Sequence, residues 1–242
     1  MTDKTAPSRE EFALPHSRAE ETPRHGFRGD LAEGPPAFPW GLTVAISREA
    51  GARGATIAKR AAVKLGWQVY NQDLIEYIAQ QGTFRQDVFD HLPETAGIWV
   101  ETQLNRLLRE QGLSRNSSIL DLARMVLSLG AQGEVVLLGR GAGCILPARS
   151  TLYVRLVAPL ADRVAYMSQW LRLTEEEAAE QVSKRDHRRA EFMATHFHRQ
   201  ANDVHQYDMV LNTSLLGEER CAELIVQGAR AKAASLVEAK EF

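Results

Sequence analysis

A glycine-rich segment, Ser-Arg-Glu-Ala-Gly-Ala-Arg-Gly-Ala-Thr from Ser47 to Thr56, has the composition of a loop that binds phosphate. It follows the apolar run Leu42–Ile46 and precedes apolar residues at helical spacing, so we expect it to join a strand to a helix. At such a junction backbone N–H groups point toward an anion, and glycines let the backbone approach it closely. The predicted phosphate-binding residues are Arg48, Gly51, Ala52, Arg53, Gly54, Ala55 and Thr56.

This loop differs from the complete phosphate-binding motif GxxxxGK[ST], in which a lysine reaches the β- and γ-phosphates and a hydroxyl holds magnesium. When Arg53 is aligned with the second glycine of this motif, Gly54 stands at the lysine. Ala55 then takes the place of the hydroxyl residue, and Thr56 comes one position late. The loop is either a tight turn without a ligand or a phosphate site in which an arginine supplies the missing charge.

A second glycine turn carries a single arginine, Arg140, directly after the apolar run 135–138. In α/β proteins ligands lie beyond the carboxyl ends of the strands, and an arginine there can hold a phosphate by a bidentate contact. We therefore predict that Arg140 binds the phosphate of a substrate. The alternative is an arginine that caps a helix or pairs with a carboxylate.

The segment 184–189, Lys-Arg-Asp-His-Arg-Arg, is dense in positive charge and is expected to follow a helix. Transfer of a phosphoryl group needs cations around the group, and mobile arginines supply them when a lid closes. We predict catalytic roles for Arg185, Arg188 and Arg189, together with Arg53 and Arg140. The alternative is a solvated basic face of a helix.

Asp73 follows the second expected strand and is predicted either to contact the substrate or to cap the next helix. Four histidines lie at 187, 196, 198 and 205, but His196 and His198 are two residues apart and point away from each other on a helix. No metal site is predicted from them. The two cysteines are far apart in sequence, which indicates reduced thiols and a cytoplasmic protein.

The elements that position these residues follow from hydrophobic spacing. Strands are expected at 42–46, 67–70, 134–138, 152–157 and 208–212, with helices between them and a capping box at Thr174. This alternation predicts a three-layer α/β fold, a parallel sheet with helices on both faces. The predicted organisation is a disordered, proline-rich tail (1–40), a domain (41–232) with a helical insertion (82–131) and a basic lid (172–200), and a C-terminal tail (233–242).

The 242 residues include 44% hydrophobic and 25% charged residues, as in a globular protein, and the net charge is −2. This balance gives no indication of a nucleic-acid partner. No apolar run is long enough to span a bilayer, and no membrane partner is predicted.

Taken in order, several segments resemble the cytidylate kinase-like family. The resemblance begins at Ile46–Gly54 with the Ser-Arg-Glu lead-in and a glycine loop without lysine, and it covers most of residues 42–230. The segments that carry it are 46–54, 57–60, 65–75, 135–143, 184–186 and 207–213. The resemblance implies a P-loop fold like that of nucleoside monophosphate kinases, with ATP and Mg²⁺ as cofactors.

The same resemblance implies roles for single residues. Arg140 is similar to an arginine that contacts the acceptor nucleotide, although Gly141 stands where that motif has aspartate. Arg185 and Asp186 match the lid motif, which makes Asp186 a predicted substrate-binding residue. Arg189 and Phe192 stand where the lid motif has aspartate and arginine.

Two functions remain open from the sequence, beside a purely structural scaffold that would bind no nucleotide. The first is an ATP-dependent kinase that phosphorylates a nucleoside monophosphate or a similar acceptor, with Arg48 or Arg53 in place of the missing lysine. The second is a nucleotide-binding sensor of the same fold with impaired catalysis. The helical insertion is compatible with a homodimer in either case.

Overall fold

Five parallel strands form the sheet among the residues that the computed structural model describes, 39–71, 92–110, 112–139 and 141–238. All of these residues belong to one unit of the chain, Pro35–Phe242. The strands are β1 (Thr43–Arg48), β2 (Gln68–Asn71), β3 (Val135–Leu138), β4 (Thr151–Val157) and β5 (Met209–Asn212). They lie in the order β2-β3-β1-β4-β5, which confirms the predicted parallel sheet and places a topological switch point beside β1.

The central strands are apolar because helices cover both faces of the sheet. All four residues of β3 and the first four of β1 are buried. Parallel pairing aligns Ile46 with Leu138 of β3, and Ser47 with Arg155 of β4. The carboxyl ends of β1, β3 and β4 are therefore side by side, and polar residues begin there.

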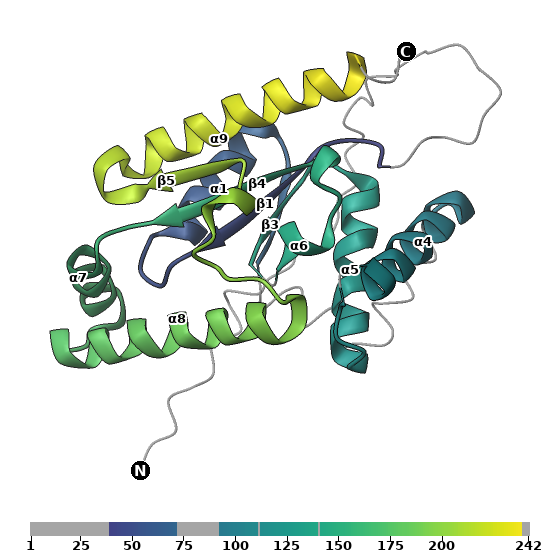
Figure 1. Ribbon diagram of the computed structural model, residues 1–242. Coiled ribbons are helices and arrows are strands. Elements are labelled where there is room, and N and C mark those ends of the chain that lie inside the picture. The colour runs from purple at the N-terminus through teal and green to yellow at the C-terminus, as the bar shows by residue number, and fades with distance from the viewer. Residues whose placement is uncertain (1–38, 72–91, 111, 140, 239–242) are drawn as a thin grey trace, which may run out of the picture. The chain divides into compact units, whose positions relative to one another are not determined.

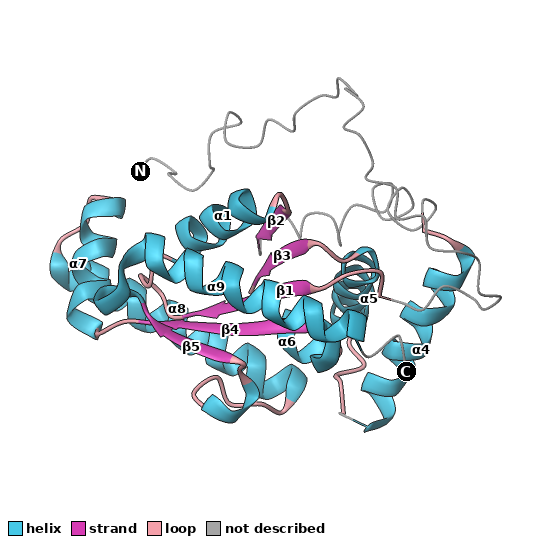
Figure 2. Ribbon diagram, turned by 90° about the horizontal axis from the view of Figure 1, so that it is seen from above, coloured by secondary structure: helices cyan, strands magenta, loops and turns pink. Residues whose placement is uncertain are grey.

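Helices form a layer on each face of the sheet (Figures 1 and 2). On one face α1 (Gly54–Leu65) and α9 (Thr213–Glu238) pack together over an apolar cluster. On the other face lie α5 (Ser117–Gln132), α6 (Ala142–Ile145) and the last turns of α8 (Glu175–Phe197), with α4 (Glu94–Glu110) packed on α5. Helix α7 (Leu160–Leu171) pairs with α8, and short 3₁₀ helices occupy Ala148–Ser150 and Val204–Gln206. The predicted three-layer architecture is confirmed.

The packing of α7 on α8 brings the basic segment to the glycine loop. A small apolar cluster joins Met167 of α7 and Ala178 and Val182 of α8 to Ala50 in the loop. Helix α8 begins at the predicted capping box, in which the Thr174 hydroxyl accepts from the Glu177 N–H and the Glu177 carboxylate accepts in return.

Two boundaries differ from the sequence expectation. The basic segment 184–189 does not follow a helix but lies inside α8, a continuous helix of 23 residues. No glycine or proline interrupts 175–197, and its buried residues recur at helical spacing, so nothing in this stretch ends the helix. Helix α9 also continues to Glu238, beyond residue 232, and changes direction at Gly217, whose φ is 75°.

The two cysteines are free and lie in different apolar clusters. Cys221 of α9 is fully buried beside α1, while Cys144 of α6 packs against the cluster on the opposite face of the sheet. Burial raises the pKa of the Cys144 thiol to about 11. Burial also raises the pKa of Cys221, and because the thiolate is the reactive form, both thiols are less reactive at neutral pH than exposed ones.

We expect iodoacetamide to alkylate Cys144 in the native protein at pH 7.5 about 100-fold more slowly than in the urea-unfolded chain. A rise of about two pKa units lowers the thiolate population by that factor. Mass spectrometry of peptides after timed quenching measures the rate at each cysteine. Equal rates in the native and unfolded protein would contradict the buried environment of Cys144.

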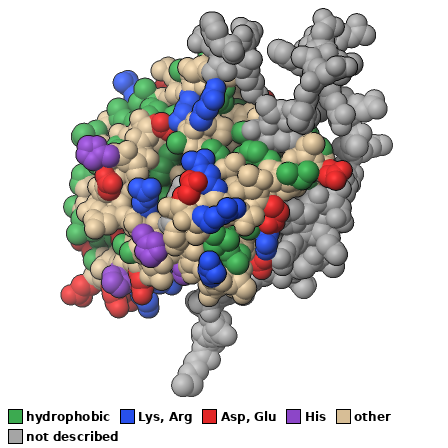
Figure 3. Space-filling model, turned by 45° about the vertical axis from the view of Figure 1, so that its right-hand side comes forward, with side chains coloured by type: hydrophobic (Ala, Val, Ile, Leu, Met, Phe, Trp, Pro, Cys, Tyr) green, Lys and Arg blue, Asp and Glu red, His purple; other side chains and the backbone are tan. Residues whose placement is uncertain are grey.

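The face seen in Figure 3 carries basic, acidic and apolar side chains interspersed with one another. None of the described helices is both long and apolar enough to cross a membrane.

Candidate active site

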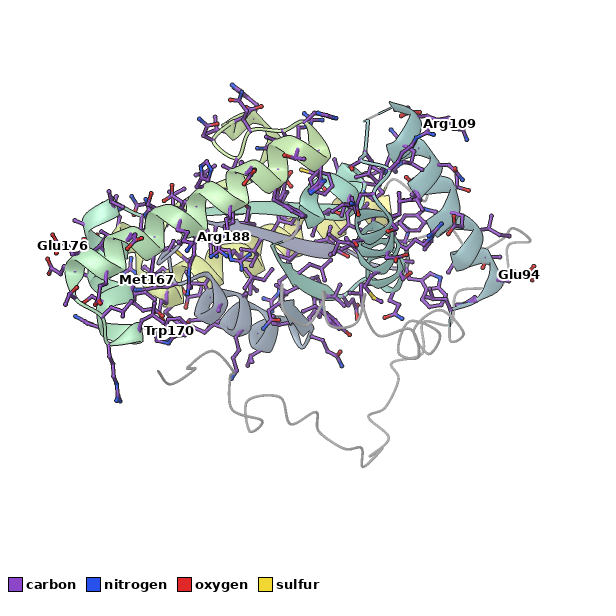
Figure 4. All side chains as sticks on the ribbon, turned by 90° about the horizontal axis from the view of Figure 1, so that it is seen from below. Glu94, Arg109, Met167, Trp170, Glu176 and Arg188 are labelled. Atoms are coloured by element: carbon purple, nitrogen blue, oxygen red, sulfur yellow. The ribbon has the colours of Figure 1, made fainter. Side chains whose placement is uncertain are left out.

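A cavity of about 620 Å³ opens at the carboxyl ends of β1, β3 and β4. The glycine loop, α6, α7 and α8 surround it, and Figure 4 labels Arg188 on α8 and Met167 and Trp170 on α7 among its lining residues. Glu49 is the single acidic residue among its described lining side chains. The basic lining side chains are Arg48, Arg53, Arg155, Arg185, Arg188 and Arg189. Such an excess of guanidinium groups suits a ligand with several negative charges.

The loop from β1 to α1 reaches the cavity through most of its predicted residues. Gly51, Gly54, Ala55 and Thr56 line it, but Ala52 is fully buried and its N–H donates to the Glu49 carbonyl oxygen (3.3 Å). Gly51 has a φ of 81°, and a Cβ there would lie 2.6 Å from the Arg163 carbonyl oxygen. Only glycine fits this position, because both the backbone angle and the close approach exclude a side chain.

Arg163 of α7, which is not among the residues predicted from the sequence, holds the loop in place. It is only 9% exposed, and its guanidinium donates to the carbonyl oxygens of Ala158 (3.0 Å) and Ala50 (3.2 Å) and to Asp186 Oδ2. Glu49 Oε2 lies 3.4 Å from its Nε. Its spacing of four residues from the apolar Met167 was the one sequence signal of a buried position.

Asp186 closes the same network from α8. Its Oδ1 accepts from the backbone N–H of Ala50 (2.7 Å), and its Oδ2 accepts from Arg163. It is not among the residues that line the cavity. Asp186 therefore holds the loop through these bonds, and its predicted contact with substrate stays a prediction.

The three predicted lid arginines all line the cavity. Arg185, Arg188 and Arg189 are three and four residues apart, so α8 presents them on one face. Arg189 Nη1 donates to the Arg48 carbonyl oxygen (3.3 Å) and lies 3.7 Å from Asp186 Oδ1. Burial lowers the pKa of Arg189, and its positively charged neighbours lower it further. A bound anion would offset this repulsion.

Arg155 is a second cation that is not among the residues predicted from the sequence. It lies in β4 opposite Ser47, and its Nη1 donates to the Ser47 Oγ (2.8 Å). Its guanidinium carbon lies 6.0 Å from the centre of the Tyr207 ring. A lone charge in the otherwise apolar strand Thr-Leu-Tyr-Val-Arg-Leu-Val was the available signal.

Arg53 turns toward the mouth of the cavity. Its guanidinium carbon lies 5.1 Å from the centre of the Tyr166 ring, and its Nε lies 3.8 Å from Glu218 Oε1. The side chain is 39% exposed, and Trp170, one turn after Tyr166 on α7, is 63% exposed. This mouth combines two aromatic rings and a guanidinium plane, surfaces on which a planar ring can stack.

Two predicted site residues, Asp73 and Arg140, lie outside the described residues. Among the residues that the structure describes, no group of three or more His, Cys, Asp or Glu side chains forms a metal site. One of the four histidines, His198, is the C-cap of α8, and its Nε2 lies 3.1 Å from the Gly112 carbonyl oxygen.

Comparison with known proteins identifies the family of the chain and supports its fold. The model of the cytidylate kinase-like family matches residues 43–215, so the chain belongs to that family. A cytidylate kinase from Ignicoccus hospitalis is 26% identical over 182 residues, which cover 75% of this chain and 95% of that enzyme. The family match, residues 43–215, runs from β1 through β5.

Two further similarities were found, one in sequence and one in structure. A uronate isomerase from Corynebacterium glutamicum is 31% identical over 104 residues, which are 43% of this chain but only 20% of that enzyme. A solved structure of an uncharacterized protein from Eubacterium ventriosum matches with a TM-score of 0.55 and 16% identity, over 78% of this chain and 98% of that chain. The second similarity shows a shared fold.

Proposed function

We propose that this protein is an ATP-dependent nucleotide kinase that transfers the γ-phosphoryl group of ATP to a nucleoside monophosphate or a similar acceptor. The observation that carries the proposal is the ratio of six arginines to one carboxylate around the cavity at the strand ends. Phosphoryl transfer depends on positioning and on cations around the transferring group, and these arginines supply both. Membership of the cytidylate kinase-like family supports the same activity.

In this proposal the donor phosphates lie against the loop from Gly51 to Thr56 and the N-terminus of α1. The loop lines the cavity, and the helix dipole favours negative charge at that end. The base of ATP would stack at the mouth, near Tyr166 and the guanidinium of Arg53.

Magnesium would be held mainly by the phosphates. Thr56 brings a hydroxyl to the cavity, whereas the Ser47 hydroxyl is bonded to Arg155 and Glu49 is bonded to Ala158 and Arg163. Mg²⁺ commonly keeps several waters and binds substrate phosphates with few protein ligands, so this sparse set fits it. When bound, the ion would neutralise charge on the transferring phosphoryl group.

The acceptor phosphate would lie on the α8 side of the cavity. Arg155, Arg185 and Arg188 would orient it, while Arg189 and Asp186 hold the loop that faces it. Asp73 and Arg140 remain proposed acceptor contacts on the ground of the family resemblance. The two free thiols support a cytoplasmic location as part of the proposal.

An ADP-release assay with Mg·ATP and a panel of nucleoside monophosphates tests this function. We expect one acceptor to raise ADP production well above the rate with ATP alone, in step with the amount of phosphorylated acceptor. No transfer to any acceptor, together with tight binding of ATP, would contradict a kinase and favour a sensor.

The sensor remains the second candidate because of two specific positions. Gly54 and Ala55 stand where the complete motif has its lysine and its magnesium-binding hydroxyl. Isothermal titration with ATP, with and without Mg²⁺, separates the two candidates. We expect Mg²⁺ to strengthen the binding of ATP to a kinase. An affinity for ATP that does not depend on Mg²⁺ would favour the sensor.

A further inference from the structure

Two glycines leave space for the side chain of Arg48, the last residue of β1. A Cβ on Gly54, the first residue of α1, would lie 2.9 Å from the Cγ of Arg48 and 3.1 Å from its Cβ. A Cβ on Gly139, at the end of β3, would overlap Nη1 of Arg48. The Arg48 side chain therefore passes alongside the start of α1, and its guanidinium lies against the backbone at the end of β3.

The backbone around this side chain is held on both sides. The Arg48 carbonyl oxygen accepts from Arg189, and the Gly139 N–H donates to the Ile46 carbonyl oxygen (2.9 Å). Arg48 pairs with Leu156 of β4 in the sheet. These contacts hold the backbone of Arg48, and Arg48 lines the cavity.

We propose that the Arg48 guanidinium contacts the β- and γ-phosphates and takes the place of the lysine that the loop lacks. Gly54 stands at the lysine position of the motif, and its missing side chain is what lets Arg48 reach this region from the strand. A planar guanidinium with five donors can bind two phosphate oxygens at once. The inference rests on the proposed function for the identity of the phosphates, but not for the presence of an anion site.

Arg53, the other arginine of the loop, is less suited to this role. Its guanidinium lies over Tyr166 and near Glu218 at the mouth, and its side chain is 39% exposed. Arg48 leaves the sheet between the ends of β3 and β4, directly under the loop. The geometry thus favours Arg48 as the phosphate contact, whereas Arg53 lies at the mouth of the cavity.

A consequence is that a lysine at position 54 does not repair the loop. Gly54→Lys recreates the lysine of the standard motif in sequence, yet its Cβ would collide with the stem of Arg48. Gly54→Ala makes the same collision and removes no charge. Because alanine favours a helix more than glycine does, Gly54→Ala separates displacement of Arg48 from loss of helix stability.

The test is isothermal titration of the full chain with inorganic tripolyphosphate. We expect Arg48→Ala to weaken binding by about 100-fold, as loss of one preorganised charged donor does in other phosphate and oxyanion sites. Arg48→Lys and Gly54→Ala should each weaken it by about 10-fold or more, and Gly54→Lys should not exceed the wild type. The matched control is Arg60→Ala, since Arg60 lies on α1 outside the cavity and pairs with Glu218 and Glu219.

The outcomes separate this inference from the proposed function. Wild-type affinity in Arg48→Ala, tighter binding in Gly54→Lys, or no binding by the wild type would overturn it. If Arg48→Ala fails to fold by circular dichroism, Arg48→Lys and Gly54→Ala decide by the same criterion. Binding that depends on Arg48 in a protein without phosphoryl transfer would support the inference and contradict the kinase.

Discussion

Replacing Asp186 with alanine is expected to lower the free energy of unfolding by about 2–3 kcal/mol. The change removes the carboxylate that accepts from the Ala50 N–H and from Arg163. Arg163 is 9% exposed, so a buried guanidinium would lose its main charged partner. Urea denaturation followed by circular dichroism measures the change in stability.

The matched control is Glu180→Ala, which removes an exposed carboxylate from the same helix. Its effect should stay within about 0.5 kcal/mol, as for other surface substitutions. The double variant Arg163→Met with Asp186→Leu should recover part of the loss, because it removes the uncompensated charge. If Asp186→Ala is as stable as Glu180→Ala, the network does not hold the loop.

Replacing Arg185 or Arg188 with alanine is expected to lower kcat for phosphoryl transfer by about 100- to 1,000-fold. Both side chains line the cavity from one face of α8, where they can stabilise charge on the transferring group. The free energy of unfolding should change little, because neither residue belongs to the network around Arg163. Steady-state kinetics with the best acceptor of the panel measures kcat and KM separately.

Lys184→Ala provides the control for this pair. Lys184 is adjacent on α8 and carries the same charge, but it is exposed and does not line the cavity. We expect its kcat to match the wild type. Equal, small losses in all three variants would indicate that the basic segment acts only through its overall field.

The fold followed from the sequence because its strongest patterns are local. Buried strands such as Thr43–Arg48 and the Thr174 capping box are signals that a few neighbouring residues carry. The continuous helix α8 was also readable, since Arg185, Arg188 and Arg189 share one helical face. The high density of positive charge in segment 184–189 led instead to the prediction of a lid that follows a helix.

The features of the site that could not be predicted from the sequence depend on contacts between distant segments. Arg163 and Asp186 are 23 residues apart, and both meet a loop more than 100 residues earlier in the chain. Within α7 the four-residue spacing of Arg163 from Met167 is the one local signal, and it does not identify the partners of a buried arginine. The role of Arg48 likewise depends on Gly139, which follows a strand that lies beside β1 only in the folded sheet.

The central claim is that the arginine-lined cavity receives the polyphosphate of a nucleotide. A series of ligands with an increasing number of phosphates tests it most directly. Isothermal titration with adenosine, AMP, ADP and ATP in the presence of Mg²⁺ gives four dissociation constants under one set of conditions. The claim predicts that affinity rises with each phosphate, by about 10-fold or more from AMP to ATP, because each phosphate adds charged contacts. Adenosine that binds as tightly as ATP, or four ligands that all fail to bind, would contradict it.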